Sequence, residues 1–230
     1  NTDIDLDLSY VKLKEMFYAP LTMTIGRQNI RLGSGLVVGD PDTNDARLAS
    51  TITAQDLSAR KSFDAIRATL DYNPLVLDIF MAKINPNTIG SGNNNDDSNL
   101  YGINAAYKFN QYNSEAEAYI IGNNARSATT KSTSVNVYGI RGSLEPISKL
   151  VLDGEIAMQR GTYSATRDRS AWAADAAASY AIDYKWSPKV GVGYVYRSGE
   201  KASTTTGDYK AWDTMYEDQT HGIVANYIFN

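Results

Sequence analysis

The sequence predicts an all-β fold, an antiparallel transmembrane β-barrel formed as a single domain by residues 1–230. Three observations predict it. Apolar and polar residues alternate along most of the chain, short and long connections alternate between these segments, and no apolar run approaches the ~20 residues of a membrane helix. Hydrophobic residues are 43% and charged residues 21%, an ordinary average in which alternating strands can be hidden. The 16 Tyr against 5 Phe suit an aromatic girdle at a bilayer surface, although Tyr also favours strands in general.

Alternation with a period of two residues defines the expected strands. In the fifth segment, for example, Tyr101, Ile103 and Ala105 share one face, while Asn104 and Lys108 share the other. Each segment has about the ~9–11 residues of a tilted membrane-spanning strand, or slightly more. The eleven expected strands cover residues 3–14, 20–32, 63–72, 74–84, 99–110, 113–123, 133–144, 147–160, 171–184, 187–198 and 219–230.

The connections between these segments alternate strictly in length. The short ones carry turn residues such as Asn73, Pro74 and Pro146, and the long ones are rich in Gly, Asn, Asp, Ser and Thr. The pattern is typical of outer-membrane barrels, which have short periplasmic turns and long extracellular loops, whereas a soluble all-β fold would not need it. The long connections are residues 33–62, 85–98, 124–132, 161–170 and 199–218.

The strand count indicates an incomplete barrel. Single-chain bacterial barrels have an even number of strands, and the first expected strand precedes a short turn, so it would enter from the extracellular side. The chain begins without a signal peptide. We therefore expect a mature or truncated chain in which at least one strand is missing before residue 3.

Composition and motifs argue against several other classes. The chain has no Cys, which excludes disulfides and thiol chemistry, and its net charge of −4 and pI of about 5.1 give no reason to expect nucleic acid. The one histidine, His221, has no nucleophile motif beside it, so we expect neither an enzyme nor a cofactor. Asp40, Asp42 and Asp45 are a candidate Ca²⁺ site, but their segment lacks the twelve-residue loop with a terminal Glu, and an ordinary turn is the alternative.

Along a strand, residues of odd and even number point to opposite faces, and we call this rule parity. Parity assigns many charged residues to one polar face of the sheet. This face should line water, because Arg or Lys at the bilayer midplane costs about 2–4 kcal/mol. Two interpretations stay open: acids and bases pair across strands and hold the wall, or the arginines form a track for a polyanion. An acidic majority on this face argues against a simple anion-attracting pore. The candidate pore-lining residues from parity are Arg67, Asp71, Lys108, Glu115, Glu117, Arg141, Asp153, Glu155, Asp175 and Arg197.

Six segments, taken in order, are residues 10–14, 21–28, 63–67, 154–161, 171–176 and 192–200. Together they resemble the alginate-export family of outer-membrane porins. The resemblance implies a barrel of about eighteen strands, with further strands before and after this chain. It also implies a charged pore whose lumen arginines, matched here by Arg27 and Arg67, help conduct a polyanionic uronate polymer. Parity contradicts the lumen position of Arg27, because it places Arg27 on the side of its strand that is expected to face lipid. Either a bulge at Gly26 turns Arg27 into the lumen, or Arg27 lies above the membrane at the rim.

We therefore expect an outer-membrane channel for passive passage of a polar, anionic saccharide or small organic solute. The alternatives are a general or cation-preferring diffusion porin and a plugged structural or adhesion barrel. The expected partners are the lipid bilayer, lipopolysaccharide and a small polar or polyanionic solute, and no periplasmic partner can be named. The connection 33–62 could fold into the pore as a constriction carrying Arg47. Gly139, Gly191 and Gly193 provide either room for solute or barrel curvature.

Overall fold

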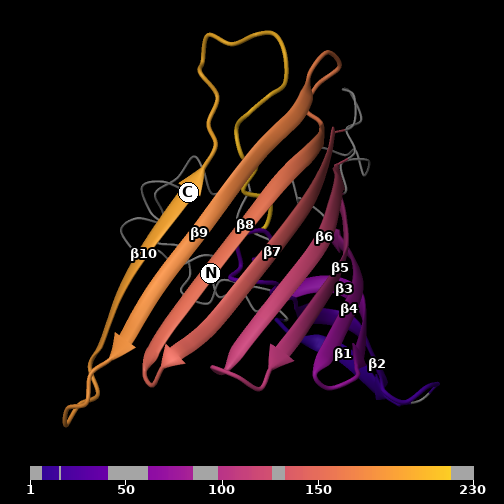
Figure 1. Ribbon diagram of the computed structural model, residues 1–230. Helices are drawn as coiled ribbons and strands as arrows, with labels where there is room; N and C mark the ends of the chain where they lie inside the picture. Colours follow the sequence, from indigo (N-terminus) through magenta and orange to yellow (C-terminus); the bar gives the residue numbers. More distant parts are fainter. Residues whose placement is uncertain (1–6, 16, 41–61, 85–97, 126–132, 219–230) are drawn as a thin grey trace, which may run out of the picture.

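The computed structural model describes residues 7–15, 17–40, 62–84, 98–125 and 133–218, which form one sheet of ten antiparallel strands (Figure 1). Each strand pairs with its neighbours in the chain, so the sheet runs from β1 to β10 without a crossover. The predicted all-β, antiparallel fold is confirmed, and the predicted strand at 219–230 lies outside the described residues. The strands are β1 (Ser9–Lys14), β2 (Leu21–Asn29), β3 (Ser62–Asp71), β4 (Leu75–Ile84), β5 (Ser98–Phe109), β6 (Ser114–Ala125), β7 (Thr133–Ile147), β8 (Leu150–Thr162), β9 (Asp168–Ala181) and β10 (Lys189–Arg197).

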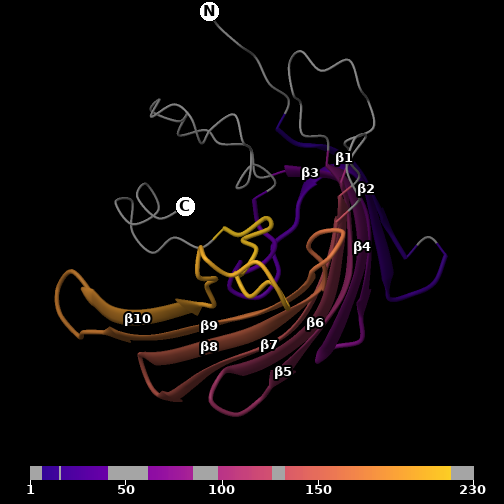
Figure 2. The ribbon, with the colours of Figure 1, turned by 90° about the horizontal axis from the view of Figure 1, so that it is seen from above.

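The sheet is strongly curved and has a convex and a concave face (Figure 2). Within the described residues it is open, because β1 pairs with β2 and β10 pairs with β9 but these two end strands do not pair with each other. An open, curved, antiparallel sheet is consistent with part of a barrel wall. The short turns lie at one end and the long connections at the other (Figure 1). We call the half of the sheet near the long connections the upper half, and the other the lower half.

The strand limits depart from the prediction at several ends. β2 ends at Asn29 instead of at residue 32, so residues 30–32 are not part of the strand. β7 continues to Ile147 instead of ending at residue 144, and its register with β8 shifts between Leu144 and Ile147. Pro146 lies in this interval and has no N–H to donate to the ladder, so the strand passes it in an irregular register. β9 also begins at Asp168 rather than at residue 171.

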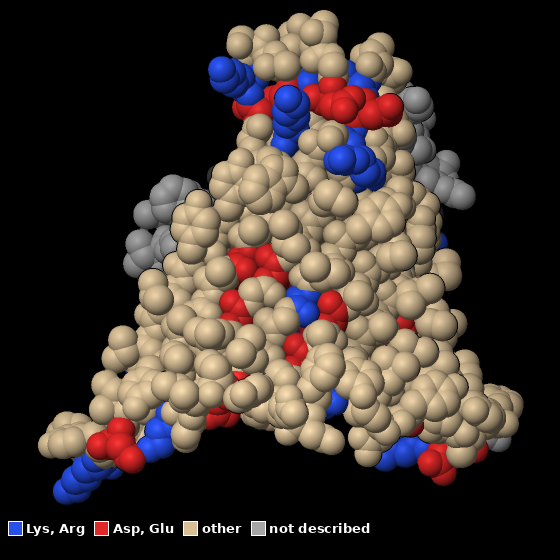
Figure 3. All heavy atoms as spheres, viewed as in Figure 1, with Lys and Arg blue, Asp and Glu red and all other residues tan. Residues whose placement is uncertain are grey.

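The convex face of the sheet carries an exposed apolar band. Neighbouring strands place Ile79, Ile103, Ile120, Tyr138 and Met158 side by side in one row, and each is 45–55% exposed. Charged residues gather at the upper and lower ends of this face, a smaller charged group is visible near its middle, and uncharged residues cover the rest (Figure 3). An apolar surface of this extent suits contact with lipid. The described residues contain no helix with the length and hydropathy needed to cross a membrane.

Two segments fold into the hollow of the concave face (Figure 2). We call them together the insert: residues 30–40, which follow β2, and residues 209–218, which end the described part of the connection after β10. A parallel bridge between Val38 and Tyr216 joins them, and the N–H of Gly39 donates to the Tyr216 carbonyl at 2.7 Å. The first part of the long connection after β2 therefore folds inward, whereas Arg47, the predicted constriction residue, lies outside the described residues.

The insert and the upper half of the concave face share one hydrophobic core. Phe63 of β3 and Tyr216 of the insert pack edge to face with ring centroids 6.2 Å apart. Ile30, Leu36 and Val38 are fully buried, and burial of each such side chain stabilises by roughly 1.5–3 kcal/mol. The insert is thus packed like a protein interior and not like a solvated loop. The wall residues of this core are Phe63, Ala65, Phe80, Ala82, Leu100, Tyr119, Ile121, Val135, Val137, Ala157, Ala171 and Ala173.

Candidate functional site

The lower half of the concave face carries a charged cluster centred on Arg141. The register of β6, β7 and β8 places Arg141 between Glu117 and Glu155. One terminal nitrogen of the guanidinium, Nη1, is 2.5 Å from Glu117 and 3.7 Å from Glu115. Its Nε and Nη2 donate to the two oxygens of Asp153. One cation is thus surrounded by carboxylates from two neighbouring strands, an arrangement of the kind described by the first of the two open interpretations, in which acids and bases pair across strands.

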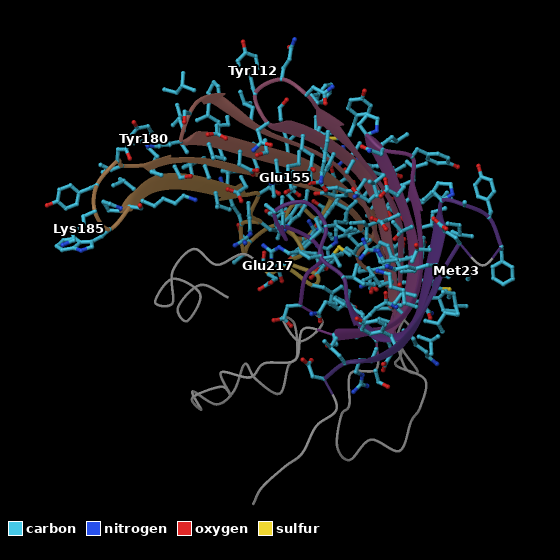
Figure 4. The ribbon with its side chains drawn as sticks, turned by 90° about the horizontal axis from the view of Figure 1, so that it is seen from below. Met23, Tyr112, Glu155, Tyr180, Lys185 and Glu217 are labelled. Carbon is cyan, nitrogen blue, oxygen red and sulfur yellow. The ribbon has the colours of Figure 1, made fainter. Side chains whose placement is uncertain are left out.

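Glu155 turns away from Arg141 and binds the insert instead. Its carboxylate accepts a hydrogen bond of 2.5 Å from the Tyr119 hydroxyl and one of 2.7 Å from the N–H of Ser34. Glu117 accepts a further bond, of 3.2 Å, from the N–H of Gly33. Glu155 is 4% exposed and points into the hollow (Figure 4). The wall carboxylates therefore have two tasks, since they neutralise an arginine and hold the backbone of the insert.

Gly139 leaves room above it, but a side chain of the wall fills this room instead of a solute. A Cβ atom at Gly139 would lie 2.1 Å from the ring of Tyr119, its partner on β6. The ring fills the space above Gly139, and this carries the Tyr119 hydroxyl to Glu155. The position that parity offered to a solute is therefore occupied. Gly193 makes no such contact, since the nearest atom to its Cβ would be 3.8 Å away.

Two further arginines on the concave face also have carboxylate partners. Arg67 donates through Nε and Nη2 to both oxygens of Asp78, at 2.9 and 2.8 Å, and Thr69 donates to the same carboxylate at 2.5 Å. Arg197 of β10 donates to Glu217 of the insert at 2.6 Å. Burial raises the pKa of the Glu217 carboxyl to about 7, although the positive charge of Arg197 lowers it. The second pair therefore links the wall to the insert.

The other candidate pore-lining residues assigned by parity also lie on the concave face, but they are more exposed to solvent. Asp71 is exposed near a short turn and accepts a hydrogen bond of 3.0 Å from the N–H of Asn73. Lys108 is also exposed, and its Nζ lies 3.8 Å from Glu115. Asp175 pairs with Glu155 in the β8–β9 register and is half-buried. The register thus places all ten residues chosen by parity on one face of the sheet.

Arg27 lies on the convex face, so its assignment to the pore lining is corrected. Gly26 has φ +122°, and a Cβ there would lie 2.4 Å from the Ser9 carbonyl oxygen, yet the pairing with β1 and β3 runs through Gly26 without a shift. Arg27 therefore keeps the face of Ile25, and its Nε and Nη2 each donate to Asp64 at 2.9 Å. Of the two alternatives, the bulge is wrong, and the ion pair lies on the convex face near the upper end of β2.

The candidate Ca²⁺ site is described only in part. Asp40 is half-buried at the end of residues 30–40, where its N–H donates to the Tyr216 carbonyl at 2.9 Å. Asp42 and Asp45 lie outside the described residues, as does His221. Among the described residues no group of three or more His, Cys, Asp or Glu side chains is arranged to hold a metal ion.

Sequence reasoning missed the polar residues that fasten the insert. Gln159 of β8 is fully buried, and its amide exchanges two hydrogen bonds with the backbone of Asp213, at 2.7 and 2.9 Å. Arg31 pairs with Asp218 across the two segments of the insert. Parity places Gln159 on the concave face but gives no sign of its partner. Of the other pair, Arg31 falls within the expected strand 20–32 and Asp218 within a long connection, so no periodic pattern relates the two residues.

Comparison with known protein families gives a match that covers nearly the whole chain. The sequence model of the family described as Alginate export matches residues 1–225 of the chain. A search of curated proteins finds no match. The family match covers nearly the whole chain and agrees with the family resemblance of the six short segments.

Proposed function

The chain belongs to the alginate export family, whose members are outer-membrane channels of the porin type, and from this premise we propose that its channel passes a polar, anionic saccharide or a small organic anion. The apolar convex band is the surface that would face lipid, and the charged lower half is the surface that would face the solute. The proposal thus assigns a separate task to each face of one sheet.

One observation carries the choice of an anionic solute: arginine guanidinium groups on the concave face are held by wall carboxylates. Arg141 binds Glu117 and Asp153, and Arg67 binds Asp78 through two parallel bonds. A guanidinium stays charged at any physiological pH and binds a carboxylate of any origin with the same geometry. A solute carboxylate can therefore replace a wall carboxylate at the guanidinium, and the arginine keeps a carboxylate partner after the exchange.

The acidic excess around Arg141 supports a second candidate, a general or cation-preferring diffusion porin. Glu115, Glu117 and Asp153 all lie within 4 Å of this one arginine, so the local charge is negative. Rings of acidic side chains favour cations in other pores. A third candidate, a plugged structural or adhesion barrel, is supported by the dry core under the insert.

Conductance of the full-length protein in a planar bilayer separates these candidates. We expect uronate oligomers to reduce the current, and neutral oligosaccharides of equal length to have a smaller effect, because only the former can bind the arginines. Replacing Arg67 with Gln should weaken the uronate effect. A cation-preferring current that uronate oligomers leave unchanged would refute the anionic solute and support the general porin. No current in either orientation would support the plugged barrel.

A further inference from the structure

The insert brings its own arginine into the hollow of the concave face. Arg31 lies in residues 30–40, and its guanidinium reaches the second segment of the insert. Nη1 donates to the Asp218 carboxylate at 2.5 Å and to the Asp218 carbonyl at 2.9 Å, and Nη2 donates to the Ser34 carbonyl at 2.5 Å. The group is therefore fixed from two directions, one from each segment.

Arg31 is the most exposed of these carboxylate-paired arginines of the hollow. Its side chain is 48% exposed, compared with 26% for Arg67, 18% for Arg141 and 24% for Arg197. The wall arginines have wall or insert carboxylates around them, and the insert covers part of the wall. A solute in the hollow would therefore meet the guanidinium of Arg31 more readily than those on the strands.

The geometry around Arg31 allows one of its partners to be exchanged. Two of its three bonds go to backbone carbonyls, of Ser34 and Asp218, and these orient the guanidinium whatever happens to the Asp218 carboxylate. Gly35 leaves space for the group: its φ is +88°, and a Cβ there would lie 2.8 Å from Nη2 of Arg31. The Asp218 carboxylate can thus leave while the cation stays in place.

We propose that Arg31 is the cation that binds a carboxylate of the passing solute, and that Asp218 occupies this position when no solute is bound. The inference rests on the proposed function, because it assumes that the solute is anionic. It adds a specificity-determining residue on the insert to those on the wall. The built-in carboxylate acts as a competitor: a monovalent anion must displace it with one charge, whereas a polyanion displaces it while its other charges bind elsewhere.

Two variants with opposite charge changes test the proposal. Arg31→Gln removes the cation, and Asp218→Asn leaves the cation without its carboxylate. A unit charge about 7 Å from a permeating ion in water changes the energy of the ion by about RT. The shift has opposite sign for chloride and for potassium, so in a KCl gradient we expect the chloride-to-potassium permeability ratio to fall about sevenfold for Arg31→Gln and to rise about sevenfold for Asp218→Asn. Block by uronate oligomers should weaken in the first variant and strengthen in the second.

The opposite signs exclude a merely structural role. Both substitutions break the bond between the two segments of the insert, so loosening of the insert would change the permeability ratio in the same direction in both variants. The matched control is Arg27→Gln, which breaks another arginine–aspartate pair, on the convex face, and should leave the ratio unchanged. Shifts of equal sign, or an equal shift for Arg27→Gln, would overturn the assignment of Arg31.

The same measurements separate this inference from the proposed function. If uronate oligomers block the parent protein and both variants equally, Arg31 does not bind solute, while the anionic channel stands. If the permeability ratios shift with opposite signs but uronate blocks none of the proteins, the anionic solute is refuted. Arg31 is then a cation that lines the conducting path, but the proposal that it binds a solute carboxylate is refuted as well. Electrophoretic mobility with and without heating confirms that each variant is folded.

Discussion

The upper and lower halves of the concave face are built from the same strands with the same alternation, but their chemistry differs. In the upper half Phe80, Leu100 and Ile121 are at most 3% exposed and pack under the insert. In the lower half Arg141 and Glu117 form a charged cluster. Parity alone assigns both halves to water. The difference shows that a lumen-facing position is wet only where no other segment of the chain covers it.

The two halves also hold the insert by different forces. The upper half contributes burial of apolar area, which is non-directional and large in sum. The lower half contributes a few directed hydrogen bonds, such as those from Ser34 and Gly33 to Glu155 and Glu117. The first force should determine how firmly the insert is held, and the second where it sits. The predictions below test this division in order of expected effect.

Truncating an apolar side chain of the insert should have the largest effect. Ile30→Ala removes a fully buried side chain from the core, and such truncations cost about 2–5 kcal/mol. We expect the insert to loosen while the sheet remains, because the pairing of the strands does not involve this side chain. Limited trypsin digestion, which should begin to cleave after Arg31, measures the loosening.

The matched control for this truncation is Ile79→Ala on the convex face. Ile79 is the same residue type but 48% exposed, so its replacement leaves no cavity and should not expose Arg31 to trypsin. Equal digestion of the two variants would contradict the division of tasks between the two halves. It would mean that the core under the insert contributes no more to holding the insert than the lipid-facing band does.

Removing the cation of the lower half should have a smaller effect on the insert. Arg141→Gln leaves Glu117 and Asp153 without their main partner, which costs about 3–5 kcal/mol for a fully buried pair and about 1–3 kcal/mol here, where water reaches the cluster. We expect a lower urea midpoint for the sheet and a stronger preference for potassium over chloride. If only the trypsin sensitivity at Arg31 changes, the cluster serves mainly to hold the insert.

Much of the fold could be predicted from the sequence, because strand pairing leaves a periodic trace. Alternation predicted the strands and the face on which Arg141 lies. It also placed Arg27 correctly on the face of Ile25, whereas the family resemblance suggested that Arg27 lies in the lumen. The insert could be predicted only in outline. Leu36 and Val38 are apolar residues in a long connection, which indicates burial. Their partners in residues 209–218 are distant in the chain, and such a contact has no period.

The pair of Glu217 and Arg197 lies where the insert meets the wall, and it predicts a pH dependence. Burial raises the pKa of the Glu217 carboxyl from 4.5 to about 7, and Arg197 of β10 forms an ion pair with it. Between these two pH values the folded protein binds more protons than a state in which Glu217 is exposed to water. The stability of the folded insert should therefore fall as the pH rises from about 4.5 to 7, and it should level off above about 8.

Glu217→Gln removes this dependence, since the amide cannot titrate. The raised pKa already includes the attraction of Arg197. Between pH 5 and pH 8 the parent insert should therefore lose about 2–3 kcal/mol of stability that the variant does not lose. Trp212, which is buried in the insert, reports its release by fluorescence in urea after Trp172 and Trp186 are replaced with Phe. If the parent insert is instead released more easily at pH 5 than at pH 8, the attraction between Arg197 and the charged carboxylate outweighs burial. The boundary between the two halves would then behave like the charged lower half and not like the dry upper half.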